Sequence, residues 1–151
     1  MPDGAFGIGS SFSNGSPTLS GMYSFSPSFD LGLNLGYISN SSSIEANGSK
    51  TTSTTSQTSI GLTGRYFFVD NKRIDPFFSF GLGFATADNR PDELGFSLMF
   101  GGQTQVAENF FVYIATGIGY SSASETENNI TRSTSELSFV TTSVGAIVYF
   151  K

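Results

Sequence analysis

Alternation between bulky apolar and very small side chains is the feature that most limits the folds open to this chain. In DPFFSFGLGFATAD, residues 75–88, every second residue from Phe78 to Phe84 is large and apolar, whereas the positions between them hold serine and glycine. Successive side chains of a β-strand point to opposite faces, so a period of two separates these sets. The stretch is predicted to be a strand with one oily face and one nearly bare face.

The same alternation recurs along the chain and defines its organisation. Phe, Tyr, Val, Ile and Thr favour strands, and clusters of Gly, Pro, Asn and Ser between the alternating segments favour turns. The pattern predicts about eight strands in a single domain that covers residues 1–151. Their expected positions are residues 4–12, 18–26, 29–39, 57–68, 75–88, 94–105, 110–121 and 137–150.

Two Ser/Thr/Asn-rich segments, residues 40–56 and 121–136, are predicted to be long loops. They follow the third and seventh expected strands, so an up-and-down arrangement places both on the same rim. With an even number of strands, both ends of the chain fall on the opposite rim.

The bare face indicates what surrounds the strands. A soluble barrel turns its apolar face inward and carries charged residues outside, but charged residues are 13% of this chain, against about 25% in a typical soluble domain. Inside the expected strands only Asp30 and Arg65 are charged, apart from Asp75 and Asp88 at the two ends of the 75–88 stretch. A membrane barrel needs large apolar side chains toward lipid and small ones in a narrow lumen. The expected fold is therefore all-β, a closed antiparallel up-and-down transmembrane β-barrel.

This arrangement assigns the large side chains to two kinds of position. Apolar residues in the middle of the strands are predicted to face lipid, and aromatic residues near strand ends are predicted to lie at the membrane interfaces. The lipid-facing set is Leu31, Leu33, Leu35, Phe78, Phe80, Leu82, Phe84, Phe96 and Leu98. The interfacial set is Tyr37, Tyr66, Phe68, Tyr120 and Phe150. The alternative for the aromatic residues is an ordinary core.

Arg65 is the residue most in need of an explanation. A charge that points into a barrel lumen requires a partner, and Asp30, Asn34 and Gln103 are on inward faces of the expected strands. We hypothesise a polar network of these four residues that plugs or gates the lumen. In the alternative, Arg65 extends its aliphatic stem and reaches the water at a rim.

Composition excludes several kinds of chemistry. The chain has no His and no Cys, which removes histidine-based acid–base and nucleophilic catalysis and thiolate metal sites. A net charge of −5 argues against nucleic-acid binding. The acidic clusters, Asp88, Asp92 and Glu93 and then Glu125 and Glu127, are interpreted as solvated charge, with a weak cation site as the alternative. We expect no enzyme activity, cofactor or metal.

Three segments carry a resemblance to a known family. YSFSPSFDLGLNLGY (23–37), GRYFFVDNKRIDPFFSFGLGFA (64–85) and VGAIVYFK (144–151) resemble the small OmpA/OmpX-like outer-membrane β-barrels of Gram-negative bacteria. Such proteins end on an aromatic residue, whereas here Phe150 is followed by Lys151. The resemblance implies insertion by the barrel assembly machinery, termini in the periplasm and long loops outside the cell. MPDGAFGIGS lacks a basic start and an apolar core, so a signal peptide is expected to have been removed.

The functional expectation is a non-enzymatic outer-membrane barrel with a structural or interaction role. Segments 40–56 and 121–136 would supply the binding surface. Three alternatives remain open: a narrow pore or transporter for small or apolar solutes, an accessory subunit of a larger outer-membrane complex, and a soluble ligand-binding β-barrel. The expected partners are the lipid bilayer, lipopolysaccharide, and possible outer-membrane or extracellular proteins.

Overall fold

The computed structural model describes residues 4–13, 16–46, 49–68, 73–88, 90–127 and 130–150, and almost all of them lie in strands. The strands are β1 (Phe6–Ser13), β2 (Ser16–Ser26), β3 (Phe29–Ala46), β4 (Ser49–Phe67), β5 (Asp75–Ala87), β6 (Arg90–Ala107), β7 (Phe110–Glu127) and β8 (Ile130–Phe150). In the described part of the chain, no helix has the length and apolarity that a membrane crossing needs.

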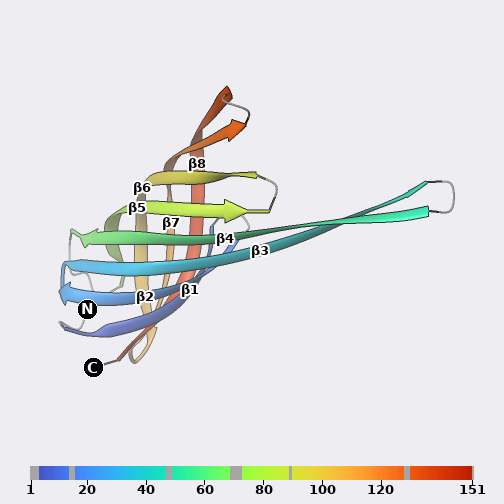
Figure 1. Cartoon of the computed structure of the whole chain (residues 1–151). Helices are drawn as coiled ribbons and strands as arrows, with labels where there is room; N and C mark the ends of the chain where they lie inside the picture. The colour runs from blue at the N-terminus through green and yellow to red at the C-terminus, as the bar shows by residue number, and fades with distance from the viewer. Residues whose placement is uncertain are drawn as a thin grey trace.

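The eight strands form one closed antiparallel barrel, as the alternation predicts. Each strand pairs with its neighbours in the chain, and β1 pairs with β8 to close the sheet. Figure 1 shows both termini at the end of the barrel where β2 turns into β3, which we call the terminal rim. The β1–β2, β3–β4, β5–β6 and β7–β8 connections lie at the other end, the hairpin rim. Asn109 has a φ of 61° in the β6–β7 turn, a left-handed conformation that asparagine tolerates well.

The prediction of two long loops from composition is wrong, because the described residues of both segments belong to strands. Residues 40–46 and 49–56 continue β3 and β4, and register partners run without a break from Phe29↔Tyr66 to Ala46↔Ser49. Similarly, β7 and β8 pair as far as Glu127↔Ile130. Threonine favours strands, and cross-strand hydroxyl contacts such as Ser41–Thr54, 3.1 Å between side-chain oxygens, support the pairing. Composition suggested loops because Ser and Asn are also turn residues.

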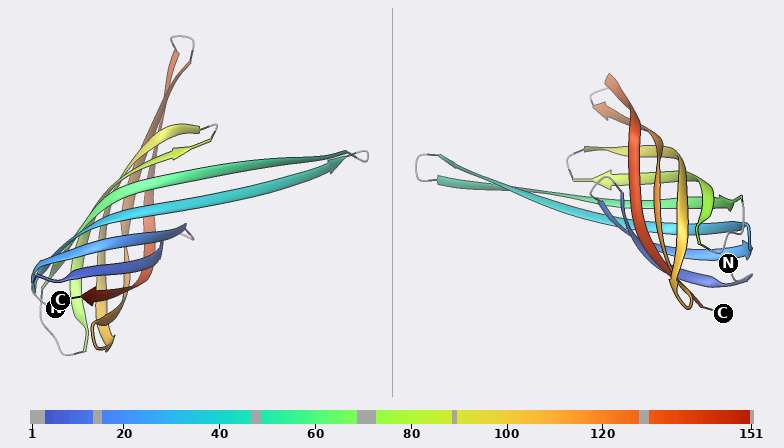
Figure 2. Two further views of the ribbon diagram at one scale, coloured as in Figure 1. Left: turned by 60° about the horizontal axis from the view of Figure 1, so that its bottom comes forward. Right: turned by 180° about the vertical axis from the view of Figure 1, so that it is seen from behind.

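The extended strands form two projections from the barrel. Figure 2 shows the β3–β4 hairpin and the β7–β8 hairpin leaving the hairpin rim in different directions. β2 pairs with β3 only as far as Gly36, and β5 pairs with β4 only as far as Gln57. We call residues 39–46 with 49–56 the β3–β4 arm. Its residues pair with each other from Ser39↔Ser56 to Ala46↔Ser49, and at its base the Asp88 N–H donates to the Ser56 carbonyl at 3.0 Å.

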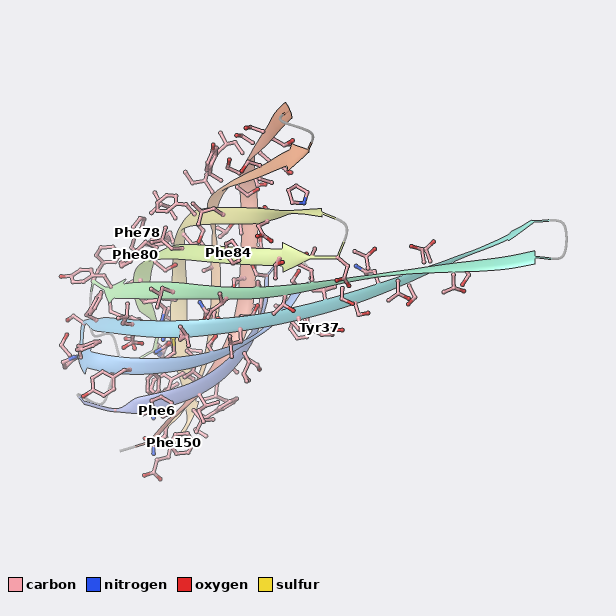
Figure 3. The ribbon with its side chains drawn as sticks, viewed as in Figure 1. Phe6, Tyr37, Phe78, Phe80, Phe84 and Phe150 are labelled. Atoms are coloured by element: carbon pink, nitrogen blue, oxygen red, sulfur yellow. The ribbon has the colours of Figure 1, made fainter. Side chains whose placement is uncertain are left out.

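The outer face carries the large apolar side chains. Phe80 is 41% exposed and Leu82 is 52% exposed, and Figure 3 shows Phe78, Phe80 and Phe84 along β5. The residues predicted to face lipid all belong to this outward set, with Leu31 and Leu98 half-buried and the others exposed. The predicted interfacial aromatic residues are exposed too: Tyr37, Tyr66, Phe68, Tyr120 and Phe150.

The inner face is filled most densely toward the terminal rim. One cluster of buried residues consists of Ala5, Met22, Phe111, Ile147 and Tyr149, and a second consists of Phe67, Phe77 and Ala115. Tyr113 packs against both clusters. Buried side chains are therefore concentrated in the lumen at this end.

Candidate functional site

Arg65 lies at the centre of a buried polar cluster in the lumen. Its Nη2 donates to Asp30 Oδ2 at 2.6 Å and to the Tyr149 hydroxyl at 2.8 Å, and its Nη1 donates to Gln103 Oε1 at 3.1 Å. Tyr149 in turn donates to Asp30 Oδ2 at 2.6 Å. Asp30 and Gln103 are fully buried and Arg65 is 3% exposed. We call these four residues the Arg65 cluster.

Strand register explains how these residues meet. Asp30 on β3 and Arg65 on β4 are direct antiparallel partners, so their side chains share the inner face. Gln103 extends from β6 and Tyr149 from β8. The cluster therefore crosses the lumen from one side of the barrel to the other, and each partner comes from a different strand.

Aromatic rings surround the guanidinium group. The Cζ atom of Arg65 lies 5.4 Å from the ring centroids of Phe67 and Tyr113 and 5.5 Å from that of Phe77. These distances suit cation–π attraction, which is strongest where water is excluded. Positive charge at this depth is thus balanced by one carboxylate and by the faces of three rings.

The cluster leaves some hydrogen-bonding capacity unused. Asp30 Oδ1, Arg65 Nε and Gln103 Nε2 are buried and have no partner among the described residues. A buried polar atom without a partner lowers the free energy of unfolding by about 1–3 kcal/mol. Because these atoms oppose folding, packing in the rest of the barrel must hold the cluster in place.

Three of the four members of the Arg65 cluster are predicted from the sequence. The structure brings Arg65, Asp30 and Gln103 together, whereas the Asn34 Nδ2 donates instead to the Thr63 hydroxyl at 2.6 Å. Tyr149 was not among the expected partners. Alternation places Tyr149 on the inner face of β8, but its approach to Arg65 depends on barrel closure between β8 and β1.

The cluster of Asp88, Asp92 and Glu93 does not form a group that could hold a metal ion. Among the side chains that the structure describes, no group of three His, Cys, Asp or Glu residues converges on one point. The side chains of Glu125 and Glu127 lie outside that described set.

A cavity of about 500 Å³ occupies the lumen between the Arg65 cluster and the hairpin rim. Its lining is dominated by Ser, Thr and Gly, with Arg65, Phe77 and Met99 toward the terminal rim and Glu93 and Glu136 toward the hairpin rim. The inner surface therefore combines a densely filled end with a hydroxyl-rich chamber.

A closed eight-strand barrel with an apolar outer face and a polar, partly filled lumen defines the class of small membrane β-barrels. The chain belongs to the outer membrane protein beta-barrel domain family, whose model matches residues 4–147. Membership of this family implies an outer-membrane location. No curated protein sequence matches the chain significantly.

Solved structures of small outer-membrane barrels share the fold. OprG from Pseudomonas aeruginosa is 13% identical with a TM-score of 0.65, covering 98% of this chain and 96% of its own. Outer membrane protein W from E. coli is 11% identical with a TM-score of 0.66, covering 99% and 100%. Neisserial surface protein A is 16% identical with a TM-score of 0.56, covering 97% and 94%. At these identities the likeness concerns the fold alone.

Proposed function

We propose that the protein is a non-enzymatic, plugged outer-membrane barrel that presents its β3–β4 arm to a partner outside the cell. The observation that carries the proposal is the Arg65 cluster, whose members are at most 3% exposed and reach across the lumen. A barrel blocked in this way is suited to a structural or interaction role rather than to free passage of solutes.

The arm supports the interaction role. It extends two paired strands well beyond the barrel (Figure 2), and its described side chains are exposed and polar from Ser39 to Ser43 and from Thr52 to Thr54. In the orientation that we propose, the termini lie in the periplasm and the arm passes the lipopolysaccharide layer. The partner would be lipopolysaccharide or an outer-membrane or extracellular protein.

Bilayer conductance tests the plug. We expect the refolded wild-type barrel to give no steady single-channel current, because the Arg65 cluster and its aromatic neighbours fill the terminal end. Asp30→Ala combined with Arg65→Ala should give frequent openings. Asn34→Ala combined with Ser59→Ala is the matched control, since both residues line the cavity beyond the cluster, and it should stay silent. A steady wild-type current would contradict the proposal.

Labelling of intact cells tests the orientation. An epitope inserted between Ala46 and Ser49 should bind antibody on intact cells, and one added after Lys151 should bind only after permeabilisation. The reverse pattern would contradict an outward-facing arm.

A narrow pore for small solutes is the second candidate, and the 500 Å³ cavity is the observation that favours it. Steady wild-type conductance would select this function. An accessory role in a larger complex predicts co-purification with a stoichiometric partner. A soluble ligand-binding barrel is not retained, because the large apolar side chains point outward.

A further inference from the structure

The lumen cavity has the dimensions of a ligand site. Its volume of about 500 Å³ lies within the roughly 300–1,000 Å³ typical of small-molecule pockets. The Arg65 cluster and the aromatic residues around it close its floor. This floor distinguishes the cavity from a passage that runs through the whole barrel.

A row of bare backbone crosses one wall of the cavity. Gly61 on β4 pairs with Gly83 on β5, and Gly83 pairs with Gly95 on β6, so three glycines form one row across three strands. All three line the cavity. Glycine within a strand marks a place where another group approaches the backbone closely.

Packing does not require glycine at two of these positions. A Cβ atom at Gly83 or Gly95 would come no nearer than 3.8 Å to any neighbouring atom, and neither residue has a positive φ. At Gly117, in contrast, a Cβ atom would collide with the backbone of Leu98 and Met99. Glycine within a strand lowers the stability of that strand. At Gly83 and Gly95, the structural consequence of having no side chain is a larger cavity.

The opposite wall supplies hydroxyl groups. Ser11 on β1, Ser20 on β2, and Thr141 and Ser143 on β8 all line the cavity and are 7–8% exposed. Each hydroxyl can donate one hydrogen bond and accept others. A ligand with many hydroxyl groups could form the hydrogen bonds that water otherwise forms with these side chains.

Charge in the cavity disfavours an anion. The positive charge of Arg65 is paired with Asp30 at the floor, and the carboxylates of Glu93 and Glu136 line the cavity near the hairpin rim. An entering anion would meet two negative charges and find no free counter-charge.

We propose that the lumen cavity binds a small, neutral, hydroxyl-rich molecule of the size of a sugar. The glycine row would accept its flat face, and the serine and threonine hydroxyls of β1, β2 and β8 would bond its oxygens. This site is separate from the interaction role proposed for the arm and does not depend on it.

Saturation-transfer NMR on the refolded barrel tests the site. The detergent must lack a sugar headgroup, since such a headgroup would compete. The probes are D-glucose, glucose 6-phosphate and glucosamine, which share one ring and differ in charge. We expect signal from glucose and none from glucose 6-phosphate. Absence of glucose signal would overturn the proposal. Signal from glucosamine alone would also overturn it, because the carboxylates rather than the hydroxyls would then select the ligand.

A matched pair of variants locates the binding. Gly83→Leu with Gly95→Leu fills the cavity and should abolish the glucose signal. Gly21→Leu is the control, because Gly21 pairs with outward-facing Ile8 and Leu33 and a Cβ there meets only Phe6, at 3.7 Å; its signal should equal that of wild type. Heat-dependent gel mobility checks that each variant is folded, and single glycine variants replace the pair if it is not. Undiminished signal from a folded cavity-filled variant would overturn the proposal.

Discussion

At the residue scale, the Arg65 cluster shows how a barrel lumen can hold a charge. Desolvation of a guanidinium group is expensive, and one carboxylate at 2.6 Å, two further acceptors and three aromatic rings offset it here. The cluster stabilises the barrel only as a set. Removal of one member should therefore harm the fold more than removal of the charged pair.

We expect Asp30→Asn to lower the free energy of unfolding by about 3–5 kcal/mol, because it leaves the Arg65 charge uncompensated. Asp30→Leu combined with Arg65→Met should recover most of this loss. The measurement is the folded fraction against urea in lipid vesicles, read from cold and boiled gel mobility. Asn34→Ala, which removes one neutral hydrogen bond, should cost about 1 kcal/mol. Equal losses for Asp30→Asn and the double variant would show that the charge pair is not the cause.

Glycine on the inner face has two separable roles, and alanine substitution distinguishes them. Gly117→Ala should destabilise the barrel by about 1–3 kcal/mol, because the added carbon collides with the backbone of β6. Gly95→Ala should be tolerated, since the added carbon enters the cavity. The same urea titration measures both. A larger loss for Gly95→Ala than for Gly117→Ala would refute the distinction.

At the scale of elements, the β3–β4 arm is a continuation of two barrel strands rather than a separate unit. Its ladder is in register with the barrel ladder below it, and the neighbouring strands end before the arm begins. Barrel residues of β3 and β4 therefore keep all their neighbours without it.

Replacement of residues 40–55 by Asn-Gly, which joins Ser39 to its register partner Ser56, should leave the barrel folded. Asn-Gly favours the tight turn of a two-residue hairpin. We expect unchanged heat-dependent gel mobility and a change in stability below about 1 kcal/mol, typical of surface changes away from the core. Failure of this variant to refold, while wild type refolds beside it, would mean that the arm directs barrel assembly.

At the scale of the whole molecule, the outer face indicates its surroundings. Exposed Phe, Leu and Ile side chains cover the barrel, and hydrocarbon is the environment in which such a surface is stable. Closure pairs β1 along its length with residues 143–150 of β8, which satisfies the edges of the first and last strands there, as hydrocarbon requires.

The absence of tryptophan from the sequence makes this exposure measurable. Leu82→Trp on the outer face should be quenched strongly by brominated lipids, because its ring would touch the acyl chains. Ser97→Trp, which points into the cavity, is the control and should be quenched weakly. Equal quenching of the two variants would contradict the assignment of the faces.

The alternation of side chains by itself determined the all-β class, the number of strands, the two faces and the rim that holds the termini. These are local properties, because strand period and turn composition are read within a few residues. The pairing of Asp30 with Arg65 was also within reach, since few inward residues could neutralise a charge.

Only the tertiary structure decided where the strands end and what meets in the lumen. Residues 40–46, 49–56, 121–127 and 130–136 belong to strands because a cross-strand ladder supports them, and composition alone cannot reveal a partner strand. Tyr149 reaches Arg65, 84 positions away in the chain, because closure curves β8 to the far side of the lumen. The cavity exists for the same reason: the glycine row and the hydroxyl wall face each other only once the sheet is closed.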